Sequence, residues 1–123
     1  MATRTPEQSI EAGTQITFHA TSSGGDDFAN SGKEIILINN ASGSAVTVTV
    51  EAHLDTADVS STNIEDTSYG TLTKANVAKS CATGQITSIG PFKPAGFNDS
   101  SGKVNITYSA TTSVTIGFVQ VYE

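Results

Sequence analysis

The sequence predicts an all-β protein, folded as an antiparallel β-sandwich of about seven to eight strands. Apolar and polar residues alternate along much of the chain, which is the pattern of strands with one buried face. Ser and Thr are abundant, and 11 glycines interrupt the alternating segments, as expected for short strands joined by turns. The length of 123 residues suffices for one domain with one core. A jelly-roll arrangement of the sandwich agrees with the same pattern.

Three strands are predicted in the first half of the chain. The first covers residues 16–20, which alternate between apolar and polar side chains. The second covers residues 34–39 and is apolar on both faces. That composition indicates a strand covered on both sides, or one with a partner on its outer face. The third covers residues 46–50, and the short turn at 40–44 predicts a hairpin between the second and third strands.

The second half of the chain predicts four further strands. Residues 72–81 are compatible with a short helix or a strand, and we favour the strand. Residues 85–90 form the next strand, which Pro91 ends. Residues 104–108 and 114–118 alternate clearly and predict a second hairpin. The two predicted hairpins resemble each other in sequence, which we interpret as the same kind of turn used twice.

Residues 1–12 are predicted to form an N-terminal arm, and residues 13–123 the sandwich domain. Thr5-Pro6-Glu7-Gln8 matches the start of one helical turn with Pro in its first position. The alternative is an extended arm. Because chain termini are usually loose unless they dock on something, an ordered arm would indicate a partner.

Composition and charge narrow the classes of partner. The chain carries six basic and 12 acidic residues, for a net charge of −6. Nucleic acid and anionic membranes both require a basic surface, so neither is expected as a partner. The start of the chain lacks an apolar signal segment, and no run approaches the roughly 18 apolar residues of a membrane span. We therefore expect a protein made in a cytoplasm that binds other proteins.

No catalytic or metal-binding motif stands out. His19 and His53 are the two histidines, and a zinc site needs three or four ligands at a characteristic spacing. Asp26 and Asp27 follow two glycines and predict a solvated turn, with a calcium loop as the alternative. Cys81 is the single cysteine and is expected in the core. We expect no enzymatic activity and no cofactor.

Two blocks of sequence carry a resemblance to a known class of proteins. The first runs from Phe28 to Asn40, and the second from Ile89 to Ser109, where GPFKP is followed by FND and GKVNITYS. Together they resemble small virion proteins of tailed phages and prophages, of the capsid decoration, or cement, type. The resemblance covers roughly residues 16–122 and is weakest in residues 53–70. It implies a β-sandwich and no catalytic residues.

The resemblance also implies a partner and a location. A decoration protein binds the major capsid protein of a tailed phage and bridges neighbouring subunits of the head shell, so that separating them breaks its own interfaces. Because packaged DNA repels negative charge, we expect it on the outer capsid surface of the virion. Closed homo-oligomers are common and multiply such contacts, and we expect a trimer over a dimer.

Two regions are predicted to contact the shell. The arm is short and able to lie across a neighbour, and residues 53–70 form a long loop of the kind that is often functional. The partner-binding residues expected there are Thr3, Arg4, Thr5, Pro6, Glu7, Asp55, Asp58 and Tyr69. Self-association is predicted on the outer face of Ile36 and Ile38, or of Val119 and Val121. The alternative is that these four side chains cover one another inside the sandwich.

Two other functions remain open from the sequence. A tail or fibre module that binds host-surface glycans would need exposed aromatic side chains, for which Tyr69 is the best candidate. A small hydrolase would have to use His19 or His53. Neither function has a motif of its own in this chain.

Overall fold

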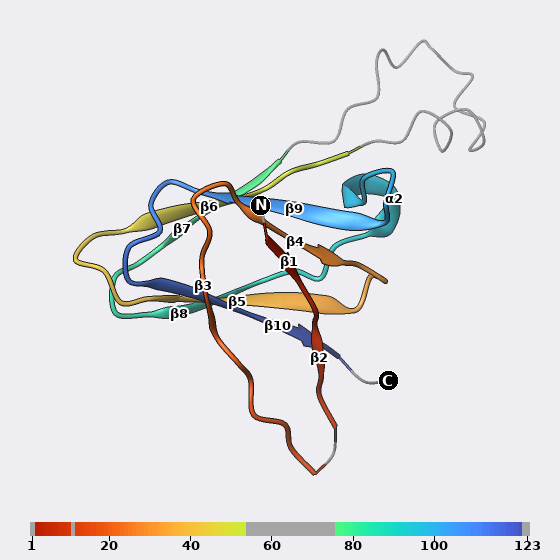
Figure 1. Cartoon of the computed structure of the whole chain (residues 1–123), viewed down its shortest axis with the longest axis horizontal. Coiled ribbons are helices and arrows are strands. Elements are labelled where there is room, and N and C mark those ends of the chain that lie inside the picture. Colours follow the sequence, from red (N-terminus) through yellow and green to blue (C-terminus); the bar gives the residue numbers. More distant parts are fainter. Residues whose placement is uncertain (1, 11, 54–75, 122–123) are drawn as a thin grey trace.

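Two β-sheets form the protein (Figure 1). The computed structural model describes residues 2–10, 12–53 and 76–121. Sheet A has the strand order β1 (Ala2–Arg4), β4 (Asp26–Ala29), β9 (Lys103–Tyr108), β6 (Val46–Val50) and β7 (Val77–Cys81). Sheet B has the order β2 (Glu7–Gln8), β10 (Val114–Gln120), β5 (Glu34–Asn40) and β8 (Ile86–Ile89), and β3 (His19–Ala20) also pairs with β10. The predicted sandwich is confirmed, and the sheets do not close into a barrel.

Both predicted hairpins are wrong in the same way. Strand β5 lies in sheet B and β6 in sheet A, so the turn at 40–45 crosses between the sheets. Strands β9 and β10 are separated likewise, and the pairs that form are β5 with β10 and β6 with β9. A short polar turn suits a hairpin and a crossing equally well, and here the buried Asn40 side chain bonds the carbonyls of Ser44 and Cys81 at the crossing.

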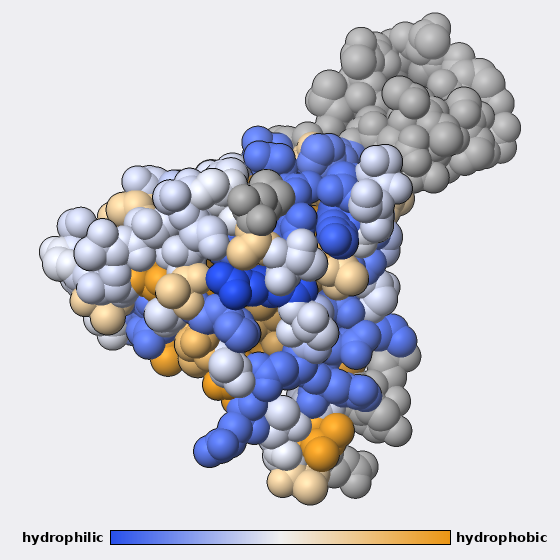
Figure 2. Space-filling model, in the orientation of Figure 1, coloured by the Kyte–Doolittle hydropathy of each residue, from blue (hydrophilic) through white to orange (hydrophobic). Residues whose placement is uncertain are grey.

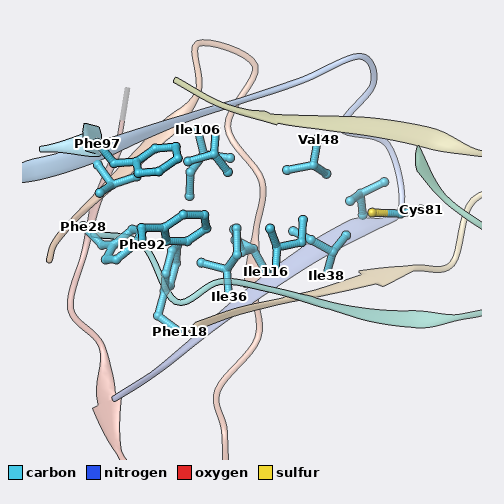
Figure 3. Packing of buried hydrophobic residues seen from close by; sticks show 14 of the residues in the cluster. Phe28, Ile36, Ile38, Val48, Cys81, Phe92, Phe97, Ile106, Ile116 and Phe118 are labelled. Carbon is cyan, nitrogen blue, oxygen red and sulfur yellow. The ribbon is translucent and has the colours of Figure 1, made fainter. Parts of the chain in front are cut away.

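The core lies between the sheets and takes alternate side chains from each central strand. Phe28 and Phe118 approach from opposite sheets with ring centroids 5.2 Å apart, and Phe92 and Phe97 stack edge-on at the same separation. Figure 3 shows these rings at one end of the core, with isoleucines and Val48 continuing towards Cys81. Cys81 is fully buried, as the sequence predicted.

The N-terminal residues are extended and paired, so the predicted helical turn is wrong and the extended alternative holds. Strand β1 pairs in parallel with β4 of sheet A, and β2 pairs in parallel with β10 of sheet B. The arm therefore adds a strand to each sheet of its own domain, which makes both sheets mixed. Residues 9–10 and 12–18 then run out from the sandwich and back before β3 (Figure 1). We call this segment the projection.

Three shorter elements complete the described part of the fold. The strand predicted for residues 16–20 is reduced to β3, and the one predicted for 72–81 is confirmed over Val77–Cys81. The segment stiffened by prolines contains a single helical turn, α2 (Pro94–Phe97). Within the described part of the chain, no helix has the length and apolar character needed to cross a membrane.

Candidate binding surfaces

The predicted arm residues Thr3, Arg4, Thr5, Pro6 and Glu7 do lie together. With Thr17 and His19 they line an open groove of about 410 Å³ beside the base of the projection. The Glu7 carboxylate accepts a hydrogen bond of 2.7 Å from the backbone amide of Thr17 and so ties the two sides of the projection to each other. The groove is therefore formed by the arm and the returning chain together.

Arg4 anchors the arm through a buried carboxylate. Arg4 Nε lies 3.3 Å from Asp26 Oδ1, and Arg4 Nη2 donates a 2.9 Å hydrogen bond to the Ala20 carbonyl. The Tyr108 hydroxyl donates a 2.6 Å hydrogen bond to the other Asp26 oxygen. Burial raises the pKa of Tyr108, and the hydrogen bond to Asp26 raises it further, so the hydroxyl keeps its proton.

This arrangement corrects the sequence interpretation of Asp26. The carboxylate is fully buried in β4 rather than solvated in a turn. Its oxygens accept from Arg4, Tyr108 and the Ser22 amide, so the carboxylate binds groups within the fold. Arg4 and Tyr108 are far from Asp26 in sequence, which is why neighbouring glycines suggested a turn instead.

The predicted self-association residues of β5 point into the core and not towards the outer face. Ile36 and Ile38 are fully buried in the core, so their predicted placement on an outer face is wrong and the alternative, that they lie inside the sandwich, holds for them. The outer face of β5 carries Ile35 and Leu37, which are half-buried. Because both faces of this strand are apolar, the sequence could not distinguish the inner set from the outer set.

The projection covers part of the outer face of the neighbouring strand β10. A Cβ on Gly117 of β10 would lie 2.9 Å from Ile16 Cγ2 and 3.6 Å from Phe18 Cδ1, so these side chains pack directly over the glycine. Val119, two residues further on, is 7% exposed. Val121, beyond the end of β10, is 46% exposed. Of the predicted pair, only Val121 is available on the surface of the described chain.

The structure describes only some of the remaining predicted residues. Asp55, Asp58 and Tyr69 lie outside the described residues. His53 Nε2 is 3.6 Å from a Glu51 oxygen, and His19 lies in the arm groove. In residues 2–10, 12–53 and 76–121, no three His, Cys, Asp or Glu side chains are grouped so that they could hold a metal ion.

Charge divides the sandwich into two ends. Turns 30–33 and 98–102 form the charged end, where the carboxylates of Glu34 and Asp99 bind the turn amides. At the opposite end the turns at 40–45, 82–85 and 109–113 come together (Figure 1). We call these three turns the uncharged end, because none of them contains an ionisable residue.

The pKa shifts at the charged end have the same physical cause. Burial alone would raise the pKa of Glu34, but hydrogen bonds from Ser31 and from the Lys33 amide outweigh burial and lower it. The pKa of Asp99 is lowered in the same way by the Asn105 side chain and the amides of Lys103 and Ser101. Both carboxylates are therefore held in the ionised form.

The uncharged end is tied together by a neutral side chain. Asn40 is fully buried, and its amide nitrogen donates hydrogen bonds of 2.9 Å to the carbonyls of Ser44 and Cys81. Its oxygen accepts from the backbone and hydroxyl of Ser42. The sequence did contain a signal for this end, in long runs without charge, but only the topology brings those runs together.

Comparison with protein families, with curated proteins and with solved structures gives no match. The class of protein is therefore defined by the fold alone, as an all-β sandwich of two mixed sheets.

Proposed function

We propose that this protein is a phage capsid decoration protein, which binds the outside of the assembled head shell and bridges neighbouring subunits of the major capsid protein. The two sequence blocks between Phe28 and Ser109 are the reason for placing it in a virion. The structural feature that supports the proposal most is the projection, which extends beyond the sandwich and carries an Ile10 side chain that is 50% exposed.

To bridge two subunits, the protein needs a segment that extends beyond its own domain and that loses little conformational entropy on binding. The projection is fixed at its base, where the Ser9 amide donates to the Gln120 carbonyl at 2.9 Å and Thr14 Oγ1 donates to the Gln8 carbonyl at 3.0 Å. An element that is already ordered loses little conformational entropy when it docks. The exposed Ile10 side chain would supply an apolar anchor for a pocket between shell subunits.

The shell gains mechanical stability from this geometry without any chemical step. Internal pressure separates shell subunits, and a protein bound to two of them resists separation with its own interfaces. Several linked copies increase the resistance, because each further contact forms at high effective concentration. The proposed partners are accordingly the major capsid protein and further copies of this chain.

Two measurements on purified virions test the proposal: the copy number of this chain per particle, and the effect of one substitution, at Ile10, on its occupancy. We expect the chain in a fixed ratio to the major capsid protein by quantitative mass spectrometry. Ile10→Asp should lower occupancy on shells at least tenfold, since a charge replaces the apolar anchor, whereas Val121→Asp should leave occupancy unchanged. A handful of copies per particle would favour a tail component, and full occupancy by Ile10→Asp would remove the projection from the interface.

A further inference from the structure

The surface of the uncharged end has a composition that differs from the rest of the molecule. Asp, Glu, Lys, Arg and His are absent from residues 35–50, 80–92 and 104–122. These runs supply all three turns of the uncharged end. The corresponding end of the space-filling view is pale, while blue hydrophilic residues dominate the body and the opposite end (Figure 2).

We infer that the uncharged end is the surface through which copies of this chain associate with one another. The inference concerns self-association of the purified protein and stands whether or not the protein decorates a capsid. It assigns the interface to turns 40–45, 82–85 and 109–113 together with the adjoining strand β8.

A large apolar side chain is exposed at the border of the uncharged end. Ile86 opens β8 directly after the turn at 82–85 and is 61% exposed, more than Ile10 or Val121, the other large apolar side chains that are exposed in the described chain. It lies on the outer face of sheet B, where it is paired with Asn39. An exposed apolar side chain surrounded by small residues is a suitable centre for a protein interface.

Strand β8 places an edge of sheet B next to the uncharged end. Strand β8 is the last strand of sheet B and pairs only with β5 among the described strands. Its residues are Ile86, Thr87, Ser88 and Ile89, with no charge and no proline within the strand. Edges that stay solitary usually carry charges, prolines or bulges, so this edge has little to prevent pairing with another strand.

Hydrogen bonds hold the three turns of the uncharged end in fixed positions. The turns are bonded to one another as well as internally: the Ala41 amide donates to the Ser113 carbonyl at 2.9 Å, the Gly84 amide donates to the Asn40 carbonyl at 2.7 Å, and the Thr83 hydroxyl bonds the Ser42 carbonyl. The surface is thus ordered before it meets a partner. Pre-ordering reduces the entropic cost of association.

Charge identifies the partner as a second copy. Each chain carries a net charge of −6, so two copies repel each other wherever their acidic regions face. A partner of opposite charge would be attracted to the acidic regions instead. A surface with no ionisable group, on a chain that is acidic elsewhere, is the surface on which another copy can approach without repulsion.

Matched charge substitutions at two exposed apolar residues test the inference. Ile86→Lys places a charge at the proposed interface, and Val121→Lys places the same charge next to the charged end. By light scattering after size exclusion, we expect wild type and Val121→Lys at a multiple of the chain mass of 12.7 kDa, and Ile86→Lys at the mass of one chain. Circular dichroism should show the same β-sheet spectrum and cooperative melting for all three.

Mixing provides a control that a folding defect cannot imitate. Ile86→Glu alone should also have the mass of one chain, and an equimolar mixture with Ile86→Lys should recover the oligomer, because opposite charges then meet. Wild type at single-chain mass up to its solubility limit would overturn the inference. So would an oligomer that survives Ile86→Lys, or one that dissociates only on Val121→Lys.

Discussion

The two ends of the sandwich perform the same structural task with different chemistry. At the charged end, the ionised Glu34 and Asp99 carboxylates accept hydrogen bonds from the amides of the turns. At the uncharged end, the neutral Asn40 amide both donates and accepts across its turns. An ionised carboxylate only accepts hydrogen bonds and loses part of that capacity when it is protonated, whereas an amide keeps its donors and acceptor at every pH. One end therefore depends on protonation and the other does not, and only the second presents a surface free of charge.

Removing Asn40 should have the largest effect on stability. Asn40→Ala leaves the Cys81 and Ser44 carbonyls and the Ser42 amide without their partner, which should lower the free energy of unfolding by about 3 kcal/mol. Urea denaturation followed by circular dichroism measures the change. Asn39→Ala on the outer face of the same strand is the control and should cost under about 1 kcal/mol. Equal losses in both variants would show that Asn40 does not hold this end together.

Replacing Glu34 should have a smaller effect that depends on pH. Because the pKa of Glu34 is lowered in the folded state, its ionisation stabilises the fold above the ordinary value of 4.5, and this contribution disappears as the pH falls through the lowered pKa. Glu34→Gln should therefore cost about 1–2 kcal/mol at neutral pH and progressively less in acid. The measurement is the urea midpoint of both proteins from neutral pH to below pH 4. A difference between them that stays constant over this range would contradict the assignment.

Asp99→Asn should produce the smallest change at the charged end. Its hydrogen bonds from Asn105, Lys103 and Ser101 resemble those of Glu34, but Asp99 is more exposed and solvent screens them. We expect a loss of under about 1 kcal/mol at neutral pH that also diminishes in acid. A loss larger than that of Glu34→Gln would reverse the order of the two carboxylates, and thermal melts at paired pH values would detect it.

The sequence predicted the elements of this fold better than their partners. Alternation along Val46–Val50 and Lys103–Tyr108 identified strands, because burial on one face leaves a period of two. It could not show that the turns at 40–45 and 109–113 cross to the other sheet, since a polar turn carries no record of which strand pairs with which. The burial of Asp26 was hidden for a related reason, as Arg4 and Tyr108 reach it only through tertiary structure.

The sequence predicted only some of the candidate binding surfaces. The arm residues from Thr3 to Glu7 do line one groove, and their role as partner-binding residues stays a prediction. The outer-face placement of Ile36 and Ile38 is wrong and its alternative holds, because both faces of β5 are apolar and sequence alone cannot distinguish them. The uncharged end was missed because its three turns are separated by long stretches of chain, and only the sheet topology brings them to one end.

Hydrogen–deuterium exchange at increasing protein concentration tests the contrast between the two ends most directly. We predict that amides of β8 and of the turns at 82–85 and 109–113 gain protection as copies associate, while the turn at 98–102 exchanges at an unchanged rate. Protection that grows at the 98–102 turn, with the 82–85 and 109–113 turns unaffected, would contradict it.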